Sequence, residues 1–412
     1  MGRVAPSLAL VLAGCAAPPS APTTAPDASG PTWSEHIAPI VGARCVGCHR
    51  AGAIGTLPLD TWTDAADFAP DLATEVRARR MPPTLLHPAA TCRPLRDAPS
   101  ALRDDEYATV LRWINAGWPE GRAGVRATAP PPPPPLAGVD HVARMPVAYT
   151  PDAARPEDDR CFLVDPGLAS DRFLTGYEVV PGAARAVHHV SLFALASRDD
   201  ARAAAALDAR DDAPGYPCFG GPGVDGASPL AIWKPGDAPT RFPAGSGLPL
   251  RAGEPLVLQV RYTLRNGAPP DQTAVRLQTA AAVPAPAWMV LVADAQLRLP
   301  PRTSAAAAQW EGPVPGRWVH GVAPVMLTMG RALRLEVHDD PVDRCLLDLP
   351  RWDHHWAGLA FFAAPVALPD GARARLTCRF DTRTRNEETV RGDGRGDEQC
   401  AAYLYVTDVA LP

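Results

Sequence analysis

Residues 44–50 read RCVGCHR, a stretch that contains a Cys-x-x-Cys-His pattern. Two thiols at this spacing can each add to one vinyl group of a haem, and the imidazole of His49 then lies against the iron. The pattern therefore predicts covalent haem c, attached through Cys45 and Cys48, with His49 as an axial ligand. The alternative is a redox or zinc-binding Cys-x-x-Cys motif that happens to precede a histidine.

A second axial ligand is predicted in residues 80–83, which read RMPP. The thioether of Met81 is a soft iron ligand, and the neighbouring prolines restrict the local backbone. Met81 is therefore the predicted distal ligand. Two alternatives are that Met81 is a core residue and that His87 binds the iron instead.

Short helices are predicted on both sides of this motif. Residues 64–79 suit one helix, and another is predicted from about Asp104 to Gly117, with its apolar residues on one stripe. The attachment motif, the methionine loop and a closing helix thus occur in order. Because these three features occur in this order, residues 32–122 resemble a class I cytochrome c domain. This resemblance implies an all-α fold for the segment.

Composition limits what the rest of the chain can be. The 412 residues carry a formal charge of -5, and only 21% of them are charged. This charge gives no sign of nucleic-acid binding, so no nucleic-acid partner is predicted. No apolar run after the first residues reaches the length that spans a membrane.

The first 15 residues have the pattern of an export signal. Arg3 precedes an apolar run that ends in Leu12-Ala13-Gly14-Cys15. This resembles a bacterial lipoprotein signal, in which Cys15 becomes the lipidated N-terminus. Residues 16–31 then read as a flexible tether. The predicted location is the bacterial cell envelope, on its periplasmic or outer-surface face, with the lipid holding the chain to the membrane. The alternative is an ordinary secretory signal that is cut later.

Export also permits disulfides. Without Cys15, Cys45 and Cys48, six of the nine cysteines remain: Cys92, Cys161, Cys218, Cys345, Cys378 and Cys400. Six cysteines allow 15 connectivities, among which the spacing alone does not choose.

Residues 123–140 are predicted to be a linker because they contain six consecutive prolines, which favour an extended rod and cannot join a sheet. Beyond them, apolar runs parted by Pro and Gly predict strands, with one helical insertion at residues 200–210. The clearest runs are residues 173–179, 255–260, 289–292, 333–337 and 403–406. This pattern predicts two all-β sandwiches, over residues 141–285 and 286–412.

Several segments of this part resemble the copper type II, ascorbate-dependent monooxygenases, the family of the peptidylglycine and dopamine β-monooxygenases. They are DRCFLVDP at 159–166, YEV at 177–179, VHHV at 187–190, WKPG at 233–236, LQVRY at 258–262, GVAPVML at 321–327 and DEQC at 397–400. The resemblance implies jelly-roll-like sandwiches and two disulfides, Cys161 with Cys218 and Cys378 with Cys400. Cys92 and Cys345 are then left, and their pairing, which stays open, would join the haem segment to the second sandwich.

The same resemblance implies two copper sites, most of whose ligands are replaced here. His188 and His189 match a histidine pair of the first site, but Arg261 stands at its third ligand position. At the second site Val325 and Leu327 replace two histidines, and Gln399 replaces a methionine, as the printed sequence shows. Valine and leucine offer no lone pair, and arginine adds a positive charge. Four of the six ligands are thus missing, which predicts that copper is absent and leaves His188 and His189 as a vestigial site or a purely structural pair.

Two functions follow from these patterns. The first is an exported haem c electron-transfer protein whose monooxygenase-like sandwiches have lost copper and catalysis; its redox partner is a protein that the sequence does not identify. The alternative is a copper monooxygenase that hydroxylates C–H bonds with O2 and receives electrons from its own haem. A haem that senses a gas or a redox state has no residue in its favour. Asp353, His354 and His355 are not expected to form a metal site, because adjacent side chains on a strand point to opposite faces.

Overall fold

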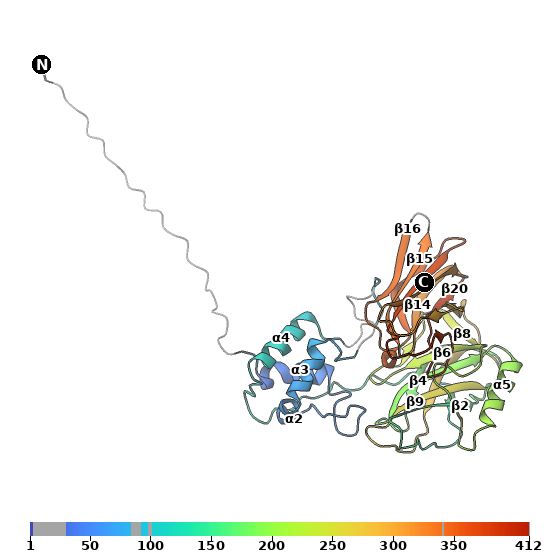
Figure 1. Cartoon of the computed structure of the whole chain (residues 1–412), viewed down its shortest axis with the longest axis horizontal. Coiled ribbons are helices and arrows are strands. Elements are labelled where there is room, and N and C mark those ends of the chain that lie inside the picture. Colours follow the sequence, from blue (N-terminus) through green and yellow to red (C-terminus); the bar gives the residue numbers. More distant parts are fainter. Residues whose placement is uncertain (3–29, 84–91, 98–100, 340–341, 412) are drawn as a thin grey trace.

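The protein is described by a computed structural model over residues 1–2, 30–83, 92–97, 101–339 and 342–411. Strands make up 37% of it and helices 14%. In Figure 1 short helices lie together at one end of the molecule and strands form the other end. The protein is therefore mainly β-sheet.

The predicted fold class, an all-α cytochrome c domain followed by two all-β sandwich domains, is wrong. No large all-α domain is apparent in the described residues, where the longest helix has 12 residues. The helix expected over residues 64–79 is two short ones, α2 and α3, since Pro70 has no N–H to donate and its ring would clash with an uninterrupted helix. The helices before the linker are η1 (Trp33–Ile37), α1 (Ala38–Arg44), α2 (Trp62–Asp67), α3 (Ala69–Arg77) and α4 (Asp104–Asn115).

These short helices share a small hydrophobic core. Trp33 and Trp113 are fully buried in it, with ring centroids 6.1 Å apart, and each indole N–H donates to a backbone carbonyl. The Arg44 guanidinium at the end of α1 pairs with the buried Glu106 carboxylate of α4 at 3.2 Å. The end of α1 is thereby held against α4, at the point where Cys45 begins the haem motif.

In the described residues the strands form four sheets, in which the strand order does not follow the sequence. The largest has nine strands: β1 (His141–Arg144), β10 (Ala274–Ala280), β3 (Arg172–Val180), β8 (Ser246–Leu250), β11 (Ala285–Ala293), β20 (Ala401–Thr407), β14 (Trp318–Val325) and β17 (Ala360–Ala367), with β7 (Thr240–Arg241) beside β3. A five-stranded sheet contains β5 (Tyr216–Pro217), β2 (Glu157–Val164), β9 (Leu256–Thr263), β4 (Val187–Leu195) and β6 (Ala227–Trp233). A four-stranded sheet contains β13 (Ala306–Pro313), β18 (Arg373–Phe380), β15 (Gly330–Asp339) and β16 (Val342–Leu349), and a small one pairs β12 (Arg298–Leu299) with β19 (Thr389–Val390).

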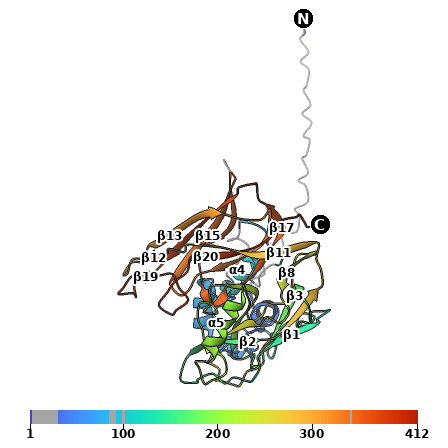
Figure 2. The ribbon, with the colours of Figure 1, turned by 90° about the vertical axis from the view of Figure 1, so that its right-hand side faces the viewer.

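The nine-stranded sheet covers two hydrophobic cores. One core lies between its first strands and the five-stranded sheet, and the other between its last strands and the four-stranded sheet. The two halves meet where β8 pairs in parallel with β11, Ser246 opposite Ala285 and Gly247 opposite Pro286. In Figures 1 and 2, β8 lies between the upper strands, which include β20 and β15, and the lower ones, which include β2. The expected pair of separate sandwiches is thus joined through one sheet.

The helical segment rests directly on the strands. The Asn266 side-chain amide donates to the carbonyls of Ala53 and Ile54, at 3.3 and 2.8 Å. Leu95 forms a β-bridge with Phe362 of β17, and the Arg351 guanidinium bonds backbone carbonyls after α3. The loop that carries the haem motif is therefore fixed against the β part.

Three disulfides are present: Cys161–Cys218, Cys378–Cys400 and Cys92–Cys345. The first two confirm the pairings that the resemblance implied. The third joins the segment before α4 to β16 across 253 residues, so the helical segment is also covalently attached to the four-stranded sheet. Disulfides persist in oxidising compartments, and their number here is typical of an extracellular or periplasmic protein.

Within the described parts of the chain, no helix is long and apolar enough to cross a bilayer.

The Cys92–Cys345 bond predicts that the two parts stay together when the linker is cut. A protease site inserted into residues 130–135 should yield fragments that migrate as one species on a non-reducing gel and as two after reduction. Cys345→Ser should separate the fragments without reductant. Cys400→Ser is the matched control, because both members of its pair lie after the cut, and it should leave the fragments joined. Separation of the unsubstituted fragments without reductant would contradict the pairing.

Candidate functional site

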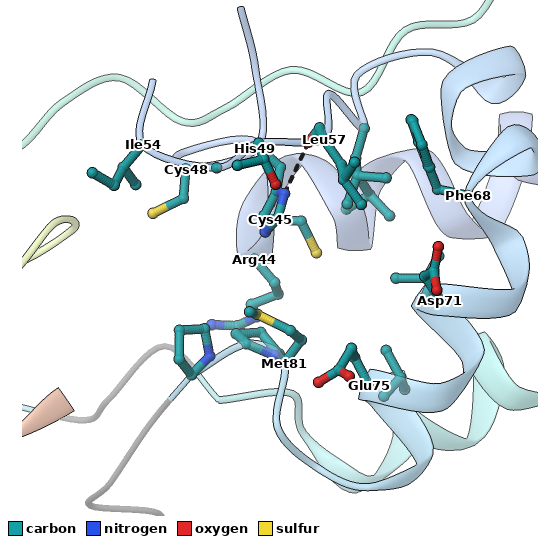
Figure 3. A pocket seen from close by; sticks show the side chains of 18 of the residues that line it. Arg44, Cys45, Cys48, His49, Ile54, Leu57, Phe68, Asp71, Glu75 and Met81 are labelled. Carbon is teal, nitrogen blue, oxygen red and sulfur yellow. Dashed lines mark hydrogen bonds between the residues drawn. The ribbon is translucent and has the colours of Figure 1, made fainter. Parts of the chain in front are cut away.

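A large cavity lies where the helical segment meets the strands. Its volume is about 380 Å³, and Cys45, Cys48, His49 and Met81 all line it. Figure 3 shows the two cysteines and His49 on one side of the open space and Met81 on the opposite side. Residues that are far apart in the sequence are thus brought around one space, as a haem attached at this motif would require.

The His49 imidazole is held in a defined orientation. Its Nδ1 lies 2.9 Å from the Leu57 carbonyl oxygen, which can only accept a hydrogen bond. Nδ1 therefore carries the proton, and Nε2 keeps its lone pair free for a ligand. This is the usual arrangement of a metal-binding histidine, whose second nitrogen is fixed by a backbone carbonyl.

Gly55 allows the His49 ring this close approach. The Gly55 N–H donates to the Cys48 carbonyl at 2.9 Å. A Cβ atom at residue 55 would lie 2.7 Å from that carbonyl oxygen and 2.8 Å from His49 Nδ1, closer than real Cβ contacts come. Only glycine fits here without displacing the motif.

The two thiols of the motif are not activated as nucleophiles. Burial raises the pKa of Cys45 to about 12 and also raises the pKa of Cys48. Neither thiol has the lowered pKa that is typical of a redox Cys-x-x-Cys motif. Neither residue takes part in a disulfide.

The wall opposite the haem motif is supplied by the strands. Glu157 at the start of β2, His188 of β4, Arg261 and Tyr262 of β9, and His355 line the same cavity. His189 does not; it lines a second cavity of about 150 Å³ together with Val325, Leu327 and Gln399. The structure thus gathers the positions that the resemblance assigned to copper, but it directs the two adjacent histidines into different cavities.

Adjacent side chains of a strand point to opposite faces, which separates the two rings, and β4 also has a β-bulge at this point. In the β4–β9 pairing Val187 lies opposite Tyr262 and His189 opposite Arg261, so His188 is the extra residue. An extra residue bends the strand locally and changes where its side chain points. Nδ1 of His188 and Nδ1 of His189 are both buried and have no hydrogen-bond partner. Burial lowers the pKa of His188 to about 4 and that of His189 well below its ordinary value.

Arg261 has a partner that sequence reasoning missed. Its guanidinium donates to the Asp159 carboxylate at 2.7 Å, and Arg395 donates to the other oxygen at 2.9 Å. Only 2% of the Asp159 side chain is exposed. Burial raises the pKa of Asp159, while the two guanidinium groups act in the opposite direction. The expected lone positive charge at position 261 is therefore half of an ion pair. Asp159 faces Arg261 across the β2–β9 pairing, a register that the sequence does not show.

The loop at the second set of expected copper positions is organised by a buried carboxylate. Glu398 accepts hydrogen bonds from the backbone N–H groups of Leu327, Met329 and Gln399. It is completely buried, as is nearly all of Met326. These side chains offer apolar surface and a satisfied carboxylate where the resemblance would place copper ligands.

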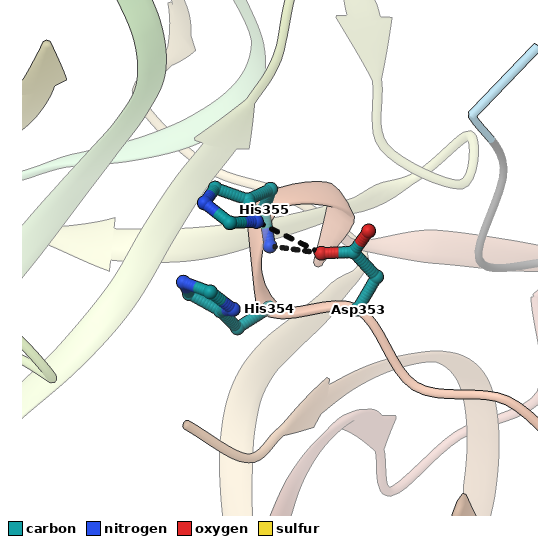
Figure 4. A group of neighbouring side chains, drawn as sticks. All are labelled: Asp353, His354 and His355. Atoms are coloured by element: carbon teal, nitrogen blue, oxygen red, sulfur yellow. Dashed lines mark hydrogen bonds and ion pairs between the residues drawn. The ribbon is translucent and has the colours of Figure 1, made fainter. Parts of the chain in front are cut away.

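The turn after β16 brings together histidines that were expected to point apart. His354 and His355 belong to a 3-10 turn, η3 (His354–Trp356), and not to a strand, so their rings lie side by side with centroids 3.8 Å apart (Figure 4). Asp353 begins this turn by accepting a hydrogen bond from the His355 N–H. An aspartate directly before a short turn was the local signal that could have revealed this geometry.

Two predicted site residues lie outside the described residues: Cys15, the predicted lipidation site, and His87, the alternative iron ligand.

Known proteins add little to this picture. No family model matches the chain, and no curated protein matches it. Among solved structures the chain is similar to the VP2 subviral particle of infectious bursal disease virus, at 9% sequence identity over 68% of this chain and 76% of that chain, with a TM-score of 0.18. A TM-score this low carries no argument about fold or function.

The buried Asp159 carboxylate predicts a difference between its two arginine partners. Arg261→Met should lower the free energy of unfolding by about 2–3 kcal/mol, because it leaves a buried carboxylate with one partner fewer. Arg395→Met should cost less than about 1 kcal/mol, since 60% of the Arg395 side chain is exposed. Urea unfolding of both variants measures the difference, and equal losses would show that Asp159 does not depend on Arg261.

Proposed function

We propose that this chain is an exported electron-transfer protein that carries one covalent haem c. The observation that carries the proposal is the placement of Cys45, Cys48, His49 and Met81 around one cavity at the end of α1. The haem would supply one-electron oxidation and reduction. Each thiol would add its S–H across one vinyl double bond, which leaves two thioether links and no leaving group.

The cavity has the chemistry that a haem needs. Most of its lining on the helical side is aliphatic or aromatic: Ile37, Ile40, Val41, Leu59, Phe68, Leu72, Val76, Leu102 and Val110. An apolar lining would exclude water from the ring and favour its burial. The protonated Nδ1 of His49 would leave Nε2 free to hold the iron, and the Met81 thioether, which lies across the cavity from His49, would be the second residue to hold it.

The strand-built part would serve as a docking or binding scaffold and not as a monooxygenase. Its likeness to the copper monooxygenases rests on the sequence segments alone. Arg261, Val325, Leu327 and Gln399 offer no usable set of ligands, and Arg261 is already paired with Asp159. His188 and His189 line different cavities, whereas in the copper monooxygenases the matching histidine pair belongs to one copper site.

The proposed location is the bacterial cell envelope, with the chain held by a lipid on Cys15. The disulfides support a location outside the cytoplasm. The haem there would exchange electrons with another redox protein, because the scaffold itself offers no oxygen-activating copper.

Haem analysis tests the proposal. Purified mature protein should contain one covalently attached haem per chain, with low-spin spectra. Cys45→Ser together with Cys48→Ser should abolish covalent attachment. Met81→Ala should remove the sulfur-to-iron charge-transfer band and lower the reduction potential, since a thioether ligand raises the potential of haem iron. If the unsubstituted protein has the spectrum of two imidazole ligands, then His87, and not Met81, is the second iron ligand.

The same preparations separate this function from the alternative. An electron-transfer protein should show no ascorbate-dependent hydroxylation of an aliphatic C–H bond when copper is supplied. Copper-dependent turnover that is lost in His188→Ala would favour the monooxygenase.

Gly55 gives a prediction with a matched control. Gly55→Ala should displace the His49 ring, because the new Cβ would collide with both the Cys48 carbonyl and the imidazole, and it should reduce haem content and shift the axial-ligand spectrum. Gly47→Ala is the matched control, because Gly47 lies between Cys45 and Cys48 and a Cβ there meets nothing within 4 Å. This variant should keep both the haem content and the axial-ligand spectrum. Equal behaviour of the two variants would mean that the close approach at residue 55 is not needed.

A further inference from the structure

The turn that follows β9 is held beside the loop of the haem motif. The Gly267 N–H donates to the Leu264 carbonyl at 3.1 Å, so Arg265 and Asn266 are the two central residues of this turn. The Asn266 side-chain amide donates to the Ile54 carbonyl at 2.8 Å. Ile54 lines the large cavity, and the backbone at Arg265 is therefore fixed next to that cavity.

Arg265 lines the large cavity as a cation without a partner. Its side chain is exposed, and among the described residues it makes no hydrogen bond, ion pair or ring contact. The other two arginines that line this cavity are already occupied, since Arg44 pairs with Glu106 and Arg261 pairs with Asp159. Within the described part of the chain, Arg265 is thus the cavity guanidinium that remains available to a ligand.

The helical wall of the cavity carries the opposite charge. Asp71 and Glu75 of α3 both line the space, and Figure 3 shows them on the side away from Ile54. Glu75 pairs with Arg80, whereas Asp71 has no ion-pair partner among the described residues. An anionic group in the cavity would therefore be repelled from α3 and attracted toward the turn that carries Arg265.

A haem attached through Cys45 and Cys48 would bring two anionic groups into this space. Its two propionate carboxylates take no part in the thioether links or in the axial bonds, and a carboxylate that leaves water needs hydrogen-bond partners. Arginine suits a carboxylate best, because its planar fork can donate two parallel N–H bonds to the two oxygens. The apolar lining on the helical side offers no such partner.

We propose that Arg265 binds a propionate carboxylate of the haem, so that the strand-built part completes the haem site. This inference rests on the proposed function, because it requires the covalent haem. It also gives the strand-built part a direct role in setting the reduction potential, since the Arg265 charge would lie next to the haem.

Other charged or titratable side chains also face the cavity. They are Arg44 of α1, Asp71 and Glu75 of α3, Glu157 of β2, His188 of β4, Arg261 and Tyr262 of β9, and His355 of η3. These groups are the same in every variant below, so a difference between two variants reports on the substituted arginine alone.

Reduction potentials of the mature, haem-loaded protein, measured across a range of pH, test the inference. Arg265→Gln should keep its haem, because the thioether links remain, but its potential should be lower at neutral and alkaline pH, since a nearby cation opposes oxidation of the iron. The substitution should also make the propionate a weaker acid by about tenfold or more. As the pH falls, this propionate takes up a proton earlier, and the potential of the variant should rise toward that of the unsubstituted protein.

Arg185→Gln is the matched control, because Arg185 is also exposed and without a partner among the described residues but does not line the cavity. It should leave the potential and its pH profile unchanged. Arg265→Lys keeps the charge and should retain most of the potential, since it loses only the forked geometry. Equal pH profiles for Arg265→Gln and Arg185→Gln would overturn the inference and leave the haem proposal standing.

A measurement on the unsubstituted protein does not depend on how the variants fold. A crystal structure of the haem-loaded protein should show an Arg265 nitrogen about 2.7–2.9 Å from a propionate oxygen. Propionates that both bind elsewhere would overturn the inference alone. A purified protein without covalent haem would overturn the proposed function and this inference with it, so the two failures are distinguishable.

Discussion

The parallel pairing of β8 with β11 is the constraint on which the architecture depends. It joins strands on two hydrophobic cores into one nine-stranded sheet. Without it each half would present a sheet edge with unpaired backbone groups at the junction. Strand β11 contributes to both cores: Ala287 packs in one, and Val290 and Val292 pack in the other.

The helical segment depends on this β part in turn. Its own core is small and its helices are short. Three contacts with the β part support it: the hydrogen bond that Asn266 donates, the β-bridge of Leu95 and the disulfide of Cys92. The cavity that holds the haem motif is therefore built at an interface. One wall comes from α1 and α3, and the other from β2, β4 and β9. A haem bound there would face titratable and charged side chains of the strands and would not be covered by its own segment alone.

That interface also explains why histidines and arginines without an obvious role gather there. Arg261, which looks like the loss of a metal ligand, makes a buried ion pair that ties β9 to β2 and, through Arg395, to the loop before β20. His188 and His355, separated by more than half of the β part in sequence, meet across the cavity wall.

Local patterns were sufficient for part of this protein. The helix from Asp104, the helical insertion near residue 200 and the strands at residues 173–179 and 403–406 were all predicted, because apolar periodicity and turn residues act within a few positions. The spacing of Cys45, Cys48 and His49 likewise fixes their side chains within one turn. The break between α2 and α3 and the turn at Asp353 were also local signals, carried by Pro70 and an aspartate, although the pattern was interpreted otherwise.

Tertiary structure alone decided the rest. Sequence periodicity says which residues form strands but not which strands pair. The fold class was wrong for another reason, because the helices before the linker are short and form no large all-α domain in the described residues. The Asp159–Arg261 ion pair, the bulge at His188 and the contact of His355 with Glu157 each need a register or a crossing between segments more than 70 residues apart. Such contacts form only when hydrophobic burial brings whole sheets together, and no short stretch of the chain encodes them.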